Sequence, residues 1–111
     1  MSKMSIFRTG LAAAVAMTAL SGAGLAAGAE PPALLAQYRC AVCHADRETL
    51  TGPSWADIAA RYRGQRQAEV IVSAKIRAGA HGSGLWHMPP HPEVSKTDAA
   101  TMASYILSIK E

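Results

Sequence analysis

One short stretch, Cys40-Ala41-Val42-Cys43-His44, constrains this chain more than any other. Two thiols three positions apart, followed at once by an imidazole, are typical of a site that attaches a c-type haem. The two cysteines form thioethers with the vinyl groups of the porphyrin, and the histidine can then reach the iron as a neutral imidazole. Taken alone, the stretch also fits a redox-active dithiol, half of a zinc site, or chance.

The N-terminal segment, residues 1–29, has the three parts of a secretory signal peptide. It starts with Lys3 and Arg8 and no acidic residue, continues with a predominantly apolar stretch, and ends in small residues. Ala27 and Ala29 meet the small-x-small rule, which predicts cleavage after Ala29. An uncleaved anchor is the alternative, but the apolar stretch barely reaches the length of a bilayer and is mostly alanine and glycine. We therefore expect export to the periplasm and no stable membrane insertion after cleavage.

The remaining residues, 30–111, form one expected domain. It is too short to build a large hydrophobic core without an additional stabilising cross-link, and a covalently held haem would provide one. Nine Lys and Arg stand against eight Asp and Glu in this part, a net charge of +1. No clustered basic face of the kind that binds nucleic acid is indicated.

The two rival sites for the cysteine pair are weaker. A thioredoxin-like dithiol needs a central sheet, and the sequence has no strands alternating with helices from which to build one. A structural zinc site needs about four ligands. His81, His87 and His91 could supply the second group of ligands that the cysteine pair would need, but the residues around these histidines fit another role better.

Short helices joined by loops are predicted for the domain, at about 32–41, 55–63 and 67–78 and from Ser95 to about 109. Ser54 and Ser95 are predicted N-caps, each with an aspartate three residues later. Gly64 and Gly79 are predicted to end the second and third helices. The segment 79–92 is so rich in glycine and proline that no regular element is expected there.

Two helices have a predicted stripe of residues along one face. On the third helix the stripe comprises Val70, Ile71, Ala74 and Arg77. On the last helix it comprises Ala99, Met102, Ala103, Ile106 and Ile109, and we expect it to pack across the first helix.

Together these features resemble the small class I cytochromes c of bacteria, over essentially all of residues 30–111. The resemblance rests on the Cys40–His44 stretch, the Thr51-Gly52-Pro53 turn, the Lys75–Gly79 helix end, the Trp86–Pro90 loop and the terminal amphipathic helix. It implies an all-α class I cytochrome c fold, with four or so short helices wrapped round one covalently attached haem c.

The resemblance also implies roles for five residues beyond the cysteines. His44 and Met88, the latter followed by two prolines, would be the axial ligands of the iron. The carbonyl of Pro53 would accept a hydrogen bond from the ring nitrogen of His44 that does not touch iron. Trp86 would donate its indole N–H to a haem propionate, or simply pack in the core. Lys75 falls near a basic residue on the propionate side, although a solvated helix face fits it as well.

The distal loop departs from the family pattern. Only His87 separates Trp86 from Met88, where the family has several residues. His87, His91 and, less well, His81 are therefore rival ligands. A bis-histidine haem would have a lower reduction potential, because axial ligands shift haem potentials over about 0.8 V.

By this resemblance the chain is an electron carrier and not an enzyme, since an iron with six ligands has no free site for a substrate. We expect a monomer that shuttles one electron between a respiratory or dehydrogenase donor and an oxidase or reductase acceptor through transient contacts. The basic residues Arg61, Arg63 and Arg66 could steer an acidic partner. A dedicated haem subunit of a dehydrogenase complex, or a ligand-binding haem sensor, are the alternatives.

Overall fold

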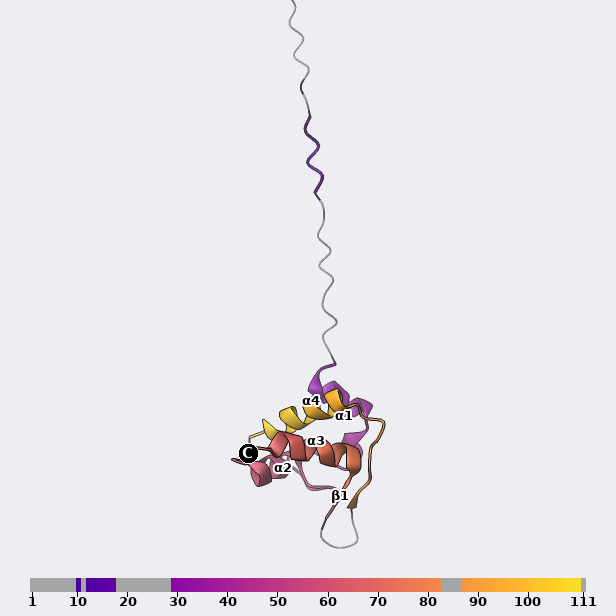
Figure 1. Cartoon of the computed structure of the whole chain (residues 1–111), viewed down its shortest axis with the longest axis vertical. Coiled ribbons are helices and arrows are strands. Elements are labelled where there is room, and N and C mark those ends of the chain that lie inside the picture. Colours follow the sequence, from indigo (N-terminus) through magenta and orange to yellow (C-terminus); the bar gives the residue numbers. More distant parts are fainter. Residues whose placement is uncertain (1–9, 11, 18–28, 83–86, 111) are drawn as a thin grey trace, which may run out of the picture.

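The computed structural model describes residues 10, 12–17, 29–82 and 87–110, and these form a mainly helical domain. In chain order the elements are α1 (Pro31–Gln37), the 3-10 helix η1 (Cys40–Val42), α2 (Trp55–Tyr62), α3 (Ala68–Ala78), strands β1 (Ala80–His81) and β2 (His87–Met88), and α4 (Lys96–Leu107). Figure 1 shows the helices gathered in one body. The all-α prediction is confirmed, with a two-stranded sheet added.

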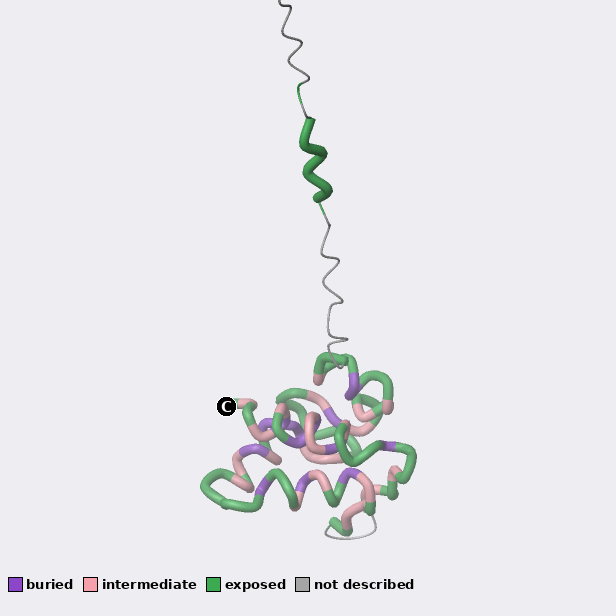
Figure 2. Tube along the Cα trace, turned by 45° about the horizontal axis from the view of Figure 1, so that its top comes forward, coloured by how far each residue is buried: buried purple, intermediate pink, exposed green. Residues whose placement is uncertain are grey.

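The N-terminal segment contributes little to the described structure. Residues 12–17 are exposed and form neither helix nor strand (Figure 2). Most of the signal peptide predicted at 1–29 lies outside the described residues, so it stays a prediction. Within the described part of the chain, no helix is long and apolar enough to cross a membrane.

Side-chain caps begin two of the helices, as predicted. The Ser54 hydroxyl accepts a hydrogen bond from the Asp57 backbone N–H at 3.1 Å, and α2 starts at the next residue. The Ser95 hydroxyl does the same for the Asp98 N–H at 3.0 Å, at the start of α4. Each such cap satisfies an N–H that has no partner within the helix and stabilises the fold by about 1 kcal/mol.

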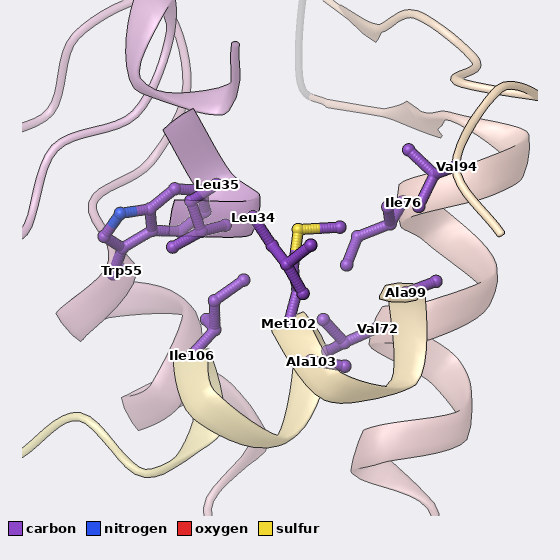
Figure 3. Close-up of a cluster of buried hydrophobic side chains, with 10 residues drawn as sticks. All are labelled: Leu34, Leu35, Trp55, Val72, Ile76, Val94, Ala99, Met102, Ala103 and Ile106. Carbon is purple, nitrogen blue, oxygen red and sulfur yellow. The ribbon is translucent and has the colours of Figure 1, made fainter. Parts of the chain in front are cut away.

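The core is built around α4. Its buried face consists of Ala99, Met102, Ala103 and Ile106, four of the five predicted residues. The fifth, Ile109, lies beyond the end of α4 and is partly buried. This face meets Leu34 and Leu35 of α1, Trp55 of α2, and Val72 and Ile76 of α3, with Val94 completing the cluster. Figure 3 shows Met102 at the centre of these side chains. The expectation that this face packs across the first helix alone was too narrow, because α4 contacts all three other α-helices and α3 most extensively.

The first predicted helix, 32–41, is wrong in extent. The helix α1 ends at Gln37, because Arg39 takes the left-handed conformation with φ of 60°. A separate 3-10 turn follows, in which the N–H groups of Cys43 and His44 both donate to the Cys40 carbonyl. The turn leaves Val42 69% exposed.

The predicted face of the third helix is also wrong. The side chains of α3 that are buried are Ala68, Val72 and Ile76, whereas Val70 is 69% exposed. These three residues are spaced four apart, so they share a second face of the same helix. Packing against α4 buries this wholly apolar face instead of the predicted one, which includes the charged Arg77.

The segment 79–92 does hold a regular element, contrary to prediction. Strands β1 and β2 pair antiparallel, with Ala80 opposite Met88 and His81 opposite His87. Gly79 makes this possible, since its φ of 83° turns the chain sharply out of α3 into β1. The glycines and prolines flank the paired residues and do not interrupt them.

Candidate haem site

The imidazole of His44 is buried and fixed in orientation. It is 8% exposed, and its Nδ1 lies 2.7 Å from the carbonyl oxygen of Pro53. A carbonyl can only accept, so Nδ1 must carry the hydrogen and donate it. In the neutral ring the other nitrogen, Nε2, then keeps its lone pair and can bind a metal. This contact is the one that the resemblance implies for Pro53.

Two further residues hold the ring of His44, and neither was identified from the sequence. The indole of Trp55 stacks on the imidazole, with ring centroids 4.4 Å apart and an interplanar angle of 20°. A Cβ added to Gly52 would lie 2.6 Å from Cε1 and 2.9 Å from Nδ1 of the same ring. A glycine just before Pro53 was the available signal, but its significance depends on how close the imidazole approaches.

The loop between His44 and α2 is closed by backbone hydrogen bonds. The N–H of Gly52 donates to the carbonyl of Cys43 at 2.7 Å, and the N–H of Trp55 donates to the carbonyl of Ala45 at 2.9 Å. These bonds bring the Thr51-Gly52-Pro53 turn back onto the cysteine motif. The position of the Pro53 carbonyl is therefore set by the main chain, which supports the ring more rigidly than a side chain would.

Both cysteines are free and partly buried. Cys40 opens the 3-10 turn and Cys43 follows it, so the turn holds the two thiols within the same short loop as His44. Burial raises the pKa of the Cys40 thiol above its ordinary value. The zinc alternative gains no support, because no group of three or more His, Cys, Asp or Glu suited to a metal ion occurs in the described part of the chain.

Met88 lies on the inner face of the β1–β2 pair. It is half-buried and faces Ala80, which is also half-buried, whereas His81 and His87 are exposed. The base of the pair is tightly packed, since a Cβ on Gly79 would lie 2.6 Å from the Met88 carbonyl oxygen. The structure therefore separates Met88 from His87 by face, although the two are neighbours in sequence.

The segment after Met88 is anchored to the end of α3. The N–H of His91 donates to the Arg77 carbonyl at 3.0 Å, and Nε of Arg77 donates to the Val94 carbonyl at 2.9 Å. Nδ1 of His91 is buried and has no hydrogen-bond partner among the described residues.

Trp86 and Lys75 are the other two residues expected near the haem. Trp86 lies outside the described residues, so its role stays a prediction. The ammonium of Lys75 donates to the Tyr62 hydroxyl at 2.7 Å and lies 5.4 Å from the centre of that ring. In this structure Lys75 is thus engaged between α3 and α2.

The residues present fit a haem bound through its vinyl groups and its iron: two free thiols on one turn, with an oriented imidazole beside them. The family model described as Cytochrome c matches residues 29–110. The chain belongs to the cytochrome c family. It carries one covalently bound c-type haem and acts in electron transfer, as the small bacterial class I members do.

Individual cytochromes c of this kind are similar over most of their length. Cytochrome c-551 of Azotobacter vinelandii is 45% identical over 74 residues, which cover 64% of this chain and 87% of that protein. Cytochrome c-552 of Hydrogenobacter thermophilus is 39% identical over 79 residues, covering 69% and 79%. The crystal structure of Nitrosomonas europaea cytochrome c552 superposes with a TM-score of 0.69 at 35% identity, covering 71% of this chain and 99% of that one. The predicted class I cytochrome c fold is confirmed.

Proposed function

We propose that this cytochrome c is a periplasmic one-electron carrier whose haem is attached at Cys40 and Cys43 and ligated by His44 and Met88. One observation carries the proposal: the Pro53 carbonyl holds Nδ1 of His44 at 2.7 Å and so leaves Nε2 as the metal-binding nitrogen. The haem supplies an iron that takes up and releases one electron.

The main task of the protein around the iron is to keep both ligands in place. The hydrogen bond to Pro53 fixes the tautomer of His44, and the stacked Trp55 limits rotation of the ring. Met88 is the last residue of β2, where its carbonyl packs against Gly79, and it precedes two prolines. Ligands held in this way need to move little when the charge of the iron changes, which favours fast electron exchange.

Met88 is favoured over His87 as the second ligand by its position. The side of the β1–β2 pair that bears Met88 is half-buried, and the side that bears His87 faces solvent. A thioether paired with an imidazole gives a higher reduction potential than two imidazoles. We therefore assign the chain to the high-potential end of an electron-transfer step, with a respiratory or dehydrogenase donor and an oxidase or reductase acceptor.

The surface beside the attachment turn is the proposed point of contact with redox partners. Val42, between the two cysteines, is 69% exposed, and Leu50 in the following loop is 47% exposed. Exposed apolar side chains at this place suit a small, transient interface close to the haem edge. We propose that the protein acts as a monomeric carrier without catalytic activity.

Electron self-exchange tests the contact surface without requiring a known partner. Val42→Asp is expected to slow self-exchange between oxidised and reduced protein severalfold, measured from NMR line broadening in mixtures, because like charges would face each other at the contact. Val70→Asp is the matched control, since Val70 is also 69% exposed but lies on α3. Equal slowing in both variants would contradict the assignment of the surface.

Carbon monoxide binding to the reduced wild-type protein at neutral pH would instead indicate a ligand-binding sensor.

A further inference from the structure

A pair of histidines on the β1–β2 strands is left unused by electron transfer. His81 and His87 lie directly opposite each other in the antiparallel register, and both are exposed. Their ring centroids are 5.8 Å apart, and the ring planes are tilted by 39°. They do not form the close parallel stack seen between His44 and Trp55.

Register places this pair on the face of the strands opposite to Met88. Residues directly opposite in an antiparallel pair project to the same face, and the next residues project to the other face. Ala80 and Met88 occupy the half-buried face, so His81 and His87 share the solvent face. A group bound between the two imidazoles would therefore not compete with Met88 for its position.

The backbone that carries the pair is held at its base. A Cβ on Gly79 would come within 3.0 Å of the Pro90 nitrogen as well as meeting the Met88 carbonyl, so α3 and the segment after β2 are in close contact. The His91 N–H bonded to the Arg77 carbonyl adds a second link between the same segments. Because the strands are held together before any ligand arrives, little conformational entropy is lost when both imidazoles bind one ion.

We propose that His81 and His87 form a two-histidine site for a divalent transition-metal ion such as Zn²⁺. Metal–nitrogen bonds of about 2.0 Å place two imidazoles on one tetrahedral ion with centroids roughly 5 Å apart, so the observed separation of 5.8 Å requires only a small closing movement. No third His, Cys, Asp or Glu of the described chain joins the pair. Water therefore completes the coordination, and the general order of divalent-metal affinities places Cu²⁺ above Zn²⁺ at such a site.

Calorimetric titration of the oxidised, haem-loaded protein with Zn²⁺ tests the site, since this ion has no redox chemistry with the haem. One equivalent is expected to bind, and His81→Gln and His87→Gln are each expected to weaken binding by roughly a hundredfold, because the second imidazole acts as an intramolecular ligand. His91→Gln is the matched control and should bind Zn²⁺ as the wild type does. NMR signals of both imidazole rings should shift with the same ion.

Two results would overturn the proposal. One is wild-type affinity in either single variant, which would place the ion elsewhere. The other is no binding at millimolar Zn²⁺, which would leave the two rings as simple neighbours. The absorption spectrum of the haem, recorded in the same titration, tests the assignment of Met88 separately from the zinc site. Loss of the methionine ligand would change the spectrum, whereas binding of Zn²⁺ on the outer face would not.

Discussion

The carbonyl oxygen of Pro53 lies 2.7 Å from Nδ1 of His44, and this contact orients the imidazole from nine residues further along the chain. It forms because the N–H of Gly52 bonds back to the Cys43 carbonyl and closes the loop. The backbone thus specifies both the tautomer and the direction of the ring. A mutation that moves the ring without touching the cysteines or the histidine should therefore change the properties of the iron.

Gly52→Ala is such a mutation. The new methyl group would lie 2.6 Å from Cε1 of His44, which is shorter than a non-bonded contact allows, so the ring or the turn must move. We expect a loss of about 1–3 kcal/mol in the free energy of unfolding, as for other overpacked sites. Guanidinium denaturation of the haem-loaded protein measures this loss, and the hyperfine-shifted NMR signals of the axial histidine should move with it.

The neighbouring exposed residue provides the control for that experiment. Thr51→Ala changes the same turn without placing an atom against the imidazole. It should leave both the stability and the signals of the axial histidine close to those of the wild type. If Gly52→Ala behaves in the same way as Thr51→Ala, the close approach to the ring has no functional consequence.

The sequence predicted the parts of this site that depend on local chemistry. The two cysteines, His44 and the caps at Ser54 and Ser95 follow from residue types at fixed spacing, and the structure shows both cap hydrogen bonds. The left-handed Arg39 and the contact of Gly52 with the imidazole could not be read in this way. Both depend on which surfaces meet after folding.

The face of α3 and the pairing of β1 with β2 were missed for a related reason. Val70 and Val72 are equally apolar, and only packing against α4 buries one and exposes the other. In the distal segment, glycine and proline signalled breaks but did not show that Ala80 would pair with Met88. The assignment of Met88 as a ligand remains a prediction that rests on the family resemblance and on its half-buried face.

Gly79→Ala should loosen the distal side of the haem. Gly79 has φ of 83° and ψ of 172°, a conformation that is nearly exclusive to glycine. A methyl group there would also meet the Met88 carbonyl at 2.6 Å. We expect a loss of about 2–4 kcal/mol in the free energy of unfolding, from backbone strain and the clash together, and a weaker methionine–iron absorption band.

Gly64→Ala separates these two causes. Gly64 has a similar φ of 79°, but nothing lies within 4 Å of its Cβ position. Its alanine variant should lose only about 1–2 kcal/mol and keep the methionine–iron band unchanged. Equal effects of the two substitutions on the band would show that the contact between Gly79 and Met88 does not hold the ligand.

Tyr38 links α1 to α4 and makes stability depend on pH in the alkaline range. Its hydroxyl donates to Oδ2 of Asp98 at 2.6 Å. This hydrogen bond, with desolvation and the negative charge of Asp98, raises the pKa of Tyr38 above its ordinary value of 10.0. The folded state therefore favours the protonated phenol, and the stabilisation is complete below the ordinary pKa and is lost as the pH rises through the higher pKa of the folded state.

Tyr38→Phe tests this linkage. The variant should have a lower melting temperature than the wild type at about pH 8, and the difference should shrink above about pH 10, where the phenol of the unfolded chain ionises. Thermal unfolding monitored by circular dichroism at a series of pH values measures both quantities. A constant difference across the series would mean that the Tyr38 proton is not linked to folding.

Met88→Ala should open one coordination position at the iron. We expect the reduction potential to fall by on the order of 0.1 V or more, within the range of about 0.8 V that axial ligands span, and carbon monoxide to bind the reduced variant. His87→Ala should retain the wild-type potential, because His87 lies on the exposed face of β2. The reverse pattern would make His87 the ligand and give the protein a low-potential role.

The absorption spectrum of the oxidised, exported wild-type protein at neutral pH tests the central claim most directly. Ligation by His44 and Met88 predicts the weak long-wavelength band that a methionine–iron bond gives in ferric haem, and its disappearance in Met88→Ala. A wild-type spectrum without that band, or one that Met88→Ala leaves unchanged, would contradict the account.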